Sequence, residues 1–243
     1  MKITKIGHCC LVIEIDNARF LTDPGAYSEG QGQITGLDAV IITHEHPDHL
    51  HLESLTQVLA NNPNVAVITN AGVGAKLAEA GIPHTIVQGR EKTEVKGVVI
   101  EAYDCKHEEI YEQIGQVQNT GYFIGEKLFY PGDSFYNPQR PVDVLALPVA
   151  GPWCKLSDAI RYALKVKPKK AFAVHDAALV PARSALYSKL PQEILPNTEE
   201  EENGFAIRST EPQATSGGRR PRCFPSPLSS TARLSWASPT IPF

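Results

Sequence analysis

The segment at residues 39–55, "AVIITHEHPDHLHLESL", joins an apolar run to a dense cluster of ionisable side chains. The run at 39–43 has the composition of a short strand that is buried on both faces. Apolar residues recur at helical spacing across 51–62, after the cluster. Four side chains able to bind metals stand between the two patterns: His44, His46, Asp48 and His49. The segment therefore predicts a buried strand that leads through a polar turn into a helix.

The residue types in this turn favour metal binding. Histidine nitrogen and carboxylate oxygen are both good zinc ligands. His44 and His46 are two residues apart, so in an extended segment they point to the same side. Asp48 and His49 follow Pro47, where the strand pattern stops and the chain turns, so this second pair can face a second point in space. A solvated polar loop is the alternative, but this density of ligands directly after a buried strand indicates two adjacent metal ions.

Strand and helix patterns alternate along the first two hundred residues. Two strand-rich halves, each with helices, predict an α+β fold in which two sheets pack face to face with helices outside. Ser157 is the predicted N-cap of the third helix. The strand patterns lie at 2–7, 9–16, 19–23, 39–43, 65–69, 97–103, 121–125, 127–130, 143–149 and 170–175. The helical patterns lie at 51–62, 71–81, 157–168 and 181–190.

The composition excludes several classes of protein. A net charge of −4 and a pI near 6.1 give no basic surface for nucleic acid. No apolar run approaches the roughly 20 residues that cross a bilayer. The cysteine count is 5, and none of the cysteines forms a C-x-x-C pair, so we expect reduced thiols in a cytoplasmic protein.

The amino-acid composition of the chain changes near Ser209. Residues 209–243 are rich in Pro, Ser, Gly and Arg and show no amphipathic period, so we expect a disordered tail after a domain at 1–208. A basic interaction tail centred on Arg219, Arg220 and Arg222 is one alternative. A non-native C-terminus is another.

The pattern H-x-H-x-D-H after an apolar strand resembles the signature of the metallo-β-lactamase-fold hydrolases. Further elements of that family follow in order, after later strands: His107 in "YDCKHEEIY", Asp133 in "YPGDSF" and His175 in "KKAFAVHDA". An early turn, "FLTDPG", offers Asp23. The opening "GHCCLVIE" resembles the subgroup that contains ascorbate-6-phosphate lactonase and many predicted hydrolases.

The resemblance implies a four-layer αββα sandwich with two metal ions at one edge, between the sheets. It implies that His44, His46 and His107 bind the first metal. It implies that Asp48, His49 and His175 bind the second, with Asp133 as the bridge. Asp48 would also handle a proton during catalysis.

Several other residues are candidates for supporting roles. Asp23 is expected to orient a histidine rather than to bind a metal itself. His8 either lines the pocket or packs. Tyr136 and Trp153 lie where the family has pocket loops, with a packed aromatic side chain as the alternative. Cys105 is expected to be a packed thiol.

Two adjacent metals lower the pKa of a shared water, and the resulting hydroxide is a nucleophile. Zinc is the expected metal, and manganese or iron fits the same ligands. The positive site favours an anionic substrate, so we predict a hydrolase of a small ester, lactone or phosphodiester. The alternatives are a nuclease-type phosphodiesterase, a mononuclear iron oxygenase and a non-catalytic metal-binding protein. A small molecule is the expected partner, and a homo-oligomer is left open.

Overall fold

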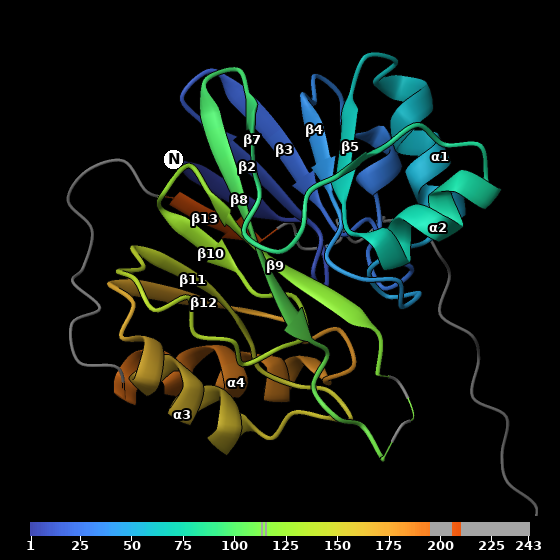
Figure 1. Ribbon diagram of the computed structural model, residues 1–243. Helices are drawn as coiled ribbons and strands as arrows, with labels where there is room; N and C mark the ends of the chain where they lie inside the picture. The colour runs from blue at the N-terminus through green and yellow to red at the C-terminus, as the bar shows by residue number, and fades with distance from the viewer. Residues whose placement is uncertain (113, 115, 195–205, 210–243) are drawn as a thin grey trace, which may run out of the picture. The chain divides into compact units, whose positions relative to one another are not determined.

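The computed structural model describes residues 1–112, 114, 116–194 and 206–209, which form two β-sheets and their covering helices (Figure 1). The first sheet has the strand order β13-β1-β2-β3-β4-β5-β6, and the second has the order β12-β11-β10-β9-β8-β7. The first sheet consists of β1 Lys2–Lys5, β2 Leu11–Ile15, β3 Ala18–Thr22, β4 Ala39–Ile41, β5 Ala66–Thr69, β6 Thr85–Ile86 and β13 Ala206–Ser209. The second consists of β7 Lys92–Val95, β8 Val98–Lys106, β9 Gln118–Ile124, β10 Leu128–Tyr130, β11 Val144–Pro148 and β12 Lys170–Val174.

Helices cover the outer face of each sheet. The helices are α1 Leu52–Asn61, α2 Ala71–Glu79, α3 Leu156–Val166 and α4 Pro181–Ile194, with a 3₁₀ turn η1 at Gln31–Gln33. Leu55 of α1 and Leu77 of α2 pack with outward-facing residues of the first sheet. Tyr162 of α3 packs with outward-facing residues of the second sheet, such as Phe129.

The two sheets bury their other faces against each other. In β2, Leu11, Ile13 and Ile15 face this inner core, whereas Val12 faces α1 and α2, as the alternation of a strand requires. The second sheet contributes residues such as Tyr122 to the same core. The predicted four-layer sandwich of two sheets with outer helices is therefore confirmed.

Some local predictions are wrong. Helix α3 begins at Leu156 and its N-cap is Lys155, so Ser157 lies inside the first turn and does not cap the helix. The edge strand β7 of the second sheet reads "KTEV", and its exposed charged residues alternate with only half-buried ones, so its strand pattern does not stand out from a loop. The short β6, at an edge of the first sheet, is exposed.

Strand β13 reaches Ser209, the first residue of the predicted tail. The rest of that tail, including Arg219, Arg220 and Arg222, lies outside the described residues, so the division at 208 stays a prediction. Among the helices of the described residues, none is long and apolar enough to cross a membrane.

Candidate metal centre

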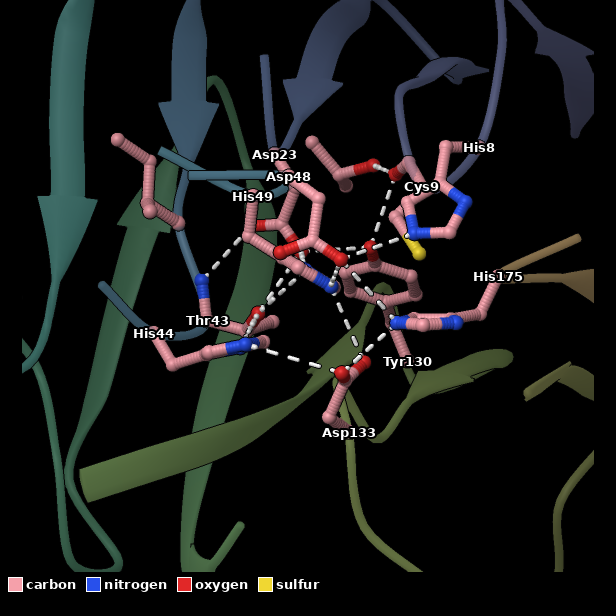
Figure 2. Close-up of polar contacts among 12 residues, drawn as sticks. His8, Cys9, Asp23, Thr43, His44, Asp48, His49, Tyr130, Asp133 and His175 are labelled. Carbon is pink, nitrogen blue, oxygen red and sulfur yellow. Dashed lines mark hydrogen bonds and ion pairs between the residues drawn. The ribbon is translucent and has the colours of Figure 1, made fainter. Parts of the chain in front are cut away.

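Strand ends bring the predicted ligands to one edge of the sandwich. The turn between β4 and α1 carries the four residues of the motif, and His107, Asp133 and His175 follow β8, β10 and β12. His44, His49, His107, Asp133 and His175 are each at most 5% exposed. His46 and Asp48 are half-buried. Residues from both sheets therefore meet in one buried polar cluster (Figure 2).

The first group of side chains is all histidine. One ring nitrogen each of His44, His46 and His107 lies within 4.8 Å of the others. The ring centroids of His46 and His107 are 4.5 Å apart, and those of His44 and His46 are 4.8 Å apart. These three histidines are the set that the resemblance implies for the first metal.

The second group contains Asp48, His49 and His175, together with His8. Oδ2 of Asp48 lies 3.4 Å from Nε2 of His175 and 3.9 Å from Nε2 of His49. The rings of His44 and His49 are only 3.9 Å apart between centroids, so the two groups are adjacent. Two ions placed in the two groups would be close neighbours.

The carboxylate of Asp133 lies between the two groups. Its Oδ1 is 3.1 Å from Nε2 of His49, and its Oδ2 is 2.9 Å from Nε2 of His175. Oδ2 is also 3.2 Å from Nε2 of His107 and 3.8 Å from Nε2 of His44. This central position suits a carboxylate that bridges two cations.

Hydrogen bonds behind the cluster hold the imidazole rings. Nδ1 of His49 donates to Oδ2 of Asp23 at 2.7 Å, and Nδ1 of His107 donates to the Glu108 carbonyl at 2.6 Å. Oγ1 of Thr43 donates to Oδ2 of Asp23 at 2.7 Å and accepts from Nδ1 of His44 at 3.1 Å. Each of these three histidines therefore presents an unprotonated Nε2 to the centre when its ring is neutral.

The tautomer of His8 argues for a supporting role. Its Nδ1 accepts the backbone N–H of Ala177 at 3.2 Å, so Nε2 carries the proton of the neutral ring. That Nε2 lies 3.2 Å from Oδ2 of Asp48 and donates to it. His8 therefore faces the cluster and orients Asp48 rather than merely packing.

Protonation in the metal-free cluster is set by burial and by neighbouring charges. Burial opposes charge on Asp133, but the imidazoles of His49, His175 and His44 together hold its pKa well below the usual range. Burial likewise opposes protonation of His49 and His175, yet the Asp133 carboxylate raises the pKa of both rings. Burial lowers the pKa of His44. Protons on His49 and His175 thus balance the negative charge of Asp133, as a bound cation would.

Polar atoms without partners show how well the cluster suits a metal ion. Buried polar atoms are almost always hydrogen-bonded, and an unpartnered one costs about 1–3 kcal/mol. Several atoms that face the centre make no hydrogen bond of acceptable geometry within the described part of the chain. They are Nε2 of His44, His49, His107 and His175, and Oδ1 of Asp133. Convergent nitrogen and oxygen atoms without partners are what a divalent cation satisfies, so the residues of the cluster fit metal binding.

Glycines and strained residues shape the backbone around the cluster. A Cβ on Gly25 would lie 1.8 Å from the Asp48 carbonyl oxygen, so the loop after β3 can approach the motif only without a side chain. Gly132, before Asp133, has φ +63°. His175 itself has φ +61° and Asp23 has φ +36°, conformations that cost free energy in non-glycine residues.

The two candidate aromatic residues have different surroundings. Nε1 of Trp153 donates to Oδ2 of Asp133 at 3.1 Å, and its ring lies edge-on to those of His107 and His175. Tyr136 is half-buried and packs against the core beneath α3, with its carbonyl accepting from Tyr162 at 2.6 Å. The structure thus brings Trp153 to the cluster and packs Tyr136 against that core.

Sequence reasoning missed several residues around the cluster. The hydroxyl of Tyr130 lies 2.6 Å from Oδ2 of Asp23. Oδ1 of Asn119 accepts the backbone N–H of Asp133 at 3.1 Å, and Nδ2 donates to Cys105 Sγ at 3.0 Å. Cys9 also reaches the cluster. Tyr130 and Asn119 have ordinary strand patterns, so only their long-range contacts reveal these positions.

Comparison with known proteins places the chain in a family. The family described as "Beta-lactamase superfamily domain" matches residues 2–175. Protein Rv0786c of Mycobacterium tuberculosis is 35% identical over an alignment of 198 residues, and the match covers 79% of this chain and 92% of that protein. A UPF0173 metal-dependent hydrolase of Carboxydothermus hydrogenoformans is 25% identical, over 72% of this chain and 84% of its own.

Solved structures share the architecture. Igni18, a metallo hydrolase of the archaeon Ignicoccus hospitalis, superposes with a TM-score of 0.62 at 18% sequence identity. The match covers 86% of this chain and 94% of Igni18. The chain belongs to the beta-lactamase superfamily and has the metallo-β-lactamase fold.

Proposed function

We propose that the protein hydrolyses a small anionic ester, lactone or phosphodiester at a site that holds two divalent metal ions, with zinc as the expected metal. The chain is a metal-dependent hydrolase of the metallo-β-lactamase superfamily. The observation that carries the finer proposal is the convergence of unpartnered Nε2 atoms around Asp133. Bound there, two metals would lower the pKa of a water towards neutrality and polarise the substrate's carbonyl or phosphoryl oxygen.

The chain's own residues divide into holding and positioning roles. His44, His46 and His107 would hold the first ion, and Asp48, His49 and His175 the second, with Asp133 between them. Asp23 and His8 position the side chains that they contact. The side chain of Asp48 keeps 18% of its surface exposed, so it can exchange a proton with water at the edge of the cluster.

Charge supports an anionic substrate. Two carboxylates, those of Asp48 and Asp133, do not cancel two divalent cations, so the loaded site keeps positive charge. A cavity of about 450 Å³ adjoins the strand that ends before His107. Its lining consists of Asp104, Cys105, Lys106, Gln116, Val117 and Gln118. The lining carries the Lys106 ammonium beside the Asp104 carboxylate, and the Gln118 amide in it is already bonded to Gly72 and Gln88.

The substrate subgroup is a further part of the proposal. The opening "GHCCLVIE" supports a relationship with sugar-phosphate lactonases such as ascorbate-6-phosphate lactonase. His8, which belongs to that stretch, contacts Oδ2 of Asp48 at 3.2 Å, so the stretch that carries the resemblance also reaches the candidate metal centre.

Metal content tests the first half of the proposal. Elemental analysis of the full chain is expected to find about two zinc ions per protein after reconstitution. His46→Ala should lower that content, because it removes one nitrogen of the first group. His51→Ala is the matched control, since His51 contacts Ser54 at 2.8 Å, outside both groups. Stable binding of a single iron, with oxygen consumption, would contradict the proposal.

A substrate panel tests the second half. The zinc-loaded protein is given lactones, carboxylate esters and phosphodiesters in matched anionic and neutral forms. We expect higher kcat/KM for the anionic member of each pair. A consistent preference for neutral or cationic compounds would overturn the charge argument.

A further inference from the structure

We propose that Cys9 supplies a sulfur ligand to the second metal ion, the one held by Asp48, His49 and His175. The inference rests on the proposed function, because it concerns the same metal centre. The family resemblance did not include this residue. Its consequence is a centre with one thiolate, which selects softer metals than histidine and aspartate alone.

The position of Cys9 is the first observation. The residue directly precedes Cys10 and β2, in the turn that carries His8. Its Sγ, a ring nitrogen of His49 and a carboxylate oxygen of Asp133 all lie within 4.8 Å of one another. All three residues are at most 1% exposed. Figure 2 shows the sulfur on the side of the cluster where His8 and His175 approach it.

The second observation is that the polar atoms of the other two members face each other, 3.1 Å apart, without a hydrogen bond of acceptable geometry between them. Nε2 of His49 and Oδ1 of Asp133 are fully buried, and neither makes a hydrogen bond of acceptable geometry within the described residues. Asp23 accepts the proton on Nδ1 of His49, so Nε2 is the ring nitrogen that faces the cluster. Nitrogen, oxygen and sulfur atoms thus converge on one point from three segments of the chain.

The neighbouring cysteine shows what a merely packed thiol looks like here. Cys10 is fully buried, but it faces the opposite side of the sheet and packs with Val12, Leu21 and Val40 beneath α1 and α2. Burial raises the pKa of the Cys10 thiol. Buried free cysteines usually behave as small apolar residues of this kind. Cys9 also packs in the inner core, but its sulfur differs because it lies within 4.8 Å of a ring nitrogen of His49 and a carboxylate oxygen of Asp133.

Coordination by Cys9 has a defined chemistry. The S–H bond breaks as the sulfur–metal bond forms, and the proton leaves to solvent. The thiolate adds a negative charge to those of Asp48 and Asp133, so it reduces the positive charge of the loaded site. Thiolates favour zinc, cobalt and cadmium over manganese and magnesium. The affinity for zinc should therefore depend on Cys9 more than the affinity for manganese does.

Cobalt substitution tests the inference without relying on activity. The full chain is titrated with Co²⁺, and the near-ultraviolet sulfur-to-cobalt charge-transfer band is recorded with the visible d–d bands. The variants are Cys9→Ser and Cys9→Ala, with Cys10→Ser as the matched control. Circular dichroism melting establishes that each variant folds. Zinc and manganese affinities are measured on the same samples.

We expect the charge-transfer band in the wild type and in Cys10→Ser, and its loss in both Cys9 variants while d–d bands remain. We expect the zinc affinity of the Cys9 variants to fall by about tenfold or more, with a smaller change for manganese. Cobalt binding without a charge-transfer band, or a band that survives Cys9→Ala, would overturn the inference and leave the proposed function standing. No cobalt binding in any sample would overturn both. If only the Cys9 variants fail to fold, the wild-type spectrum is the test: a charge-transfer band supports sulfur coordination, and its absence overturns the inference.

Discussion

Oδ2 of Asp23 lies 2.7 Å from Nδ1 of His49, and both side chains are fully inaccessible to solvent. The same oxygen lies 2.6 Å from the hydroxyl of Tyr130 and 2.7 Å from Oγ1 of Thr43. A carboxylate behind a metal-binding histidine fixes the ring and raises its basicity. Asp23 thereby connects the core between the sheets to the candidate metal centre.

Replacing Asp23 should weaken metal binding strongly. Oδ1 of Asp23 accepts the Thr43 N–H, and Oδ2 faces three donors. In Asp23→Asn one of these two positions becomes an N–H₂ group, which cannot accept, so at least one buried donor loses its acceptor. We expect zinc affinity to fall by about 10- to 100-fold, measured by competition with a chromophoric chelator. Asp38→Asn is the matched control. Asp38 accepts the backbone N–H of Arg19 at 2.8 Å, and neither residue belongs to the cluster. An unchanged affinity in Asp23→Asn would contradict the role of Asp23.

Tyr130→Phe tests the next link behind Asp23. Loss of the hydroxyl removes one donor to the carboxylate, and a bond to a charged group contributes about 1.5–3 kcal/mol. We expect lower stability in urea denaturation together with lower zinc affinity. Tyr122→Phe is the control: Tyr122 is equally buried in the same inner core, but its hydroxyl donates to the Val87 carbonyl at 3.1 Å. If both variants lose stability but neither loses zinc affinity, Tyr130 has only a packing role.

Gly25→Ala should disturb Asp48 through the backbone. The added Cβ would lie 1.8 Å from the Asp48 carbonyl oxygen, so the turn of the motif must shift. Misplacing a catalytic group by about 1 Å can cost roughly 100-fold in rate, so we expect a clear fall in kcat/KM. Gly72→Ala serves for comparison, because its added Cβ would meet Gln118 Cβ at an ordinary 3.4 Å. Equal activity in the two variants would mean that the loop after β3 adapts freely.

Metal binding should strengthen as pH rises through neutrality. Asp133 raises the pKa of His49 and of His175 despite their burial. Folded-state pKa values above the unfolded value of about 6.5 stabilise the metal-free protein below that pH, and this stabilisation is lost as pH rises through the folded pKa. A metal needs the unprotonated rings, so its stabilising effect has the opposite pH dependence.

Thermal melting with and without zinc from about pH 6 to about pH 8 measures this effect. We expect the difference in Tm between the zinc-loaded and metal-free protein to widen with pH. The low pKa of Asp133 leaves that carboxylate charged throughout, so it adds no change in this window. A constant or narrowing difference would show that His49 and His175 do not release protons to the metal.

The layered architecture could be predicted because its signals are local. The apolar run at 39–43 and the helical spacing after it appear as β4 and α1, and the alternation in β2 separates inner from outer faces. The edge strand β7 escaped prediction because its alternation is short and weak: exposed Lys92 and Glu94 alternate with Thr93 and Val95, which are only half-buried. The start of α3 was misplaced because Lys155, which has no side-chain capping bond, occupies the N-cap position.

The candidate site was predictable only in part, for a related reason. The motif at 44–49 concentrates its chemistry within a few residues, whereas Tyr130 and Asn119 act through partners far along the chain. The tautomer of His8 depends on the backbone of Ala177, which no local pattern connects to it. The role of Cys9 depends on the same kind of distant contact, with His49 and Asp133.

Anomalous diffraction at the zinc edge from crystals of the reconstituted protein tests the central claim most directly. We predict two anomalous peaks roughly 3.5–4 Å apart. One should lie within bonding distance of His44, His46 and His107, and the other within bonding distance of Asp48, His49 and His175, with Asp133 between them. The absence of anomalous peaks at these side chains, or zinc bound only elsewhere, would contradict the account.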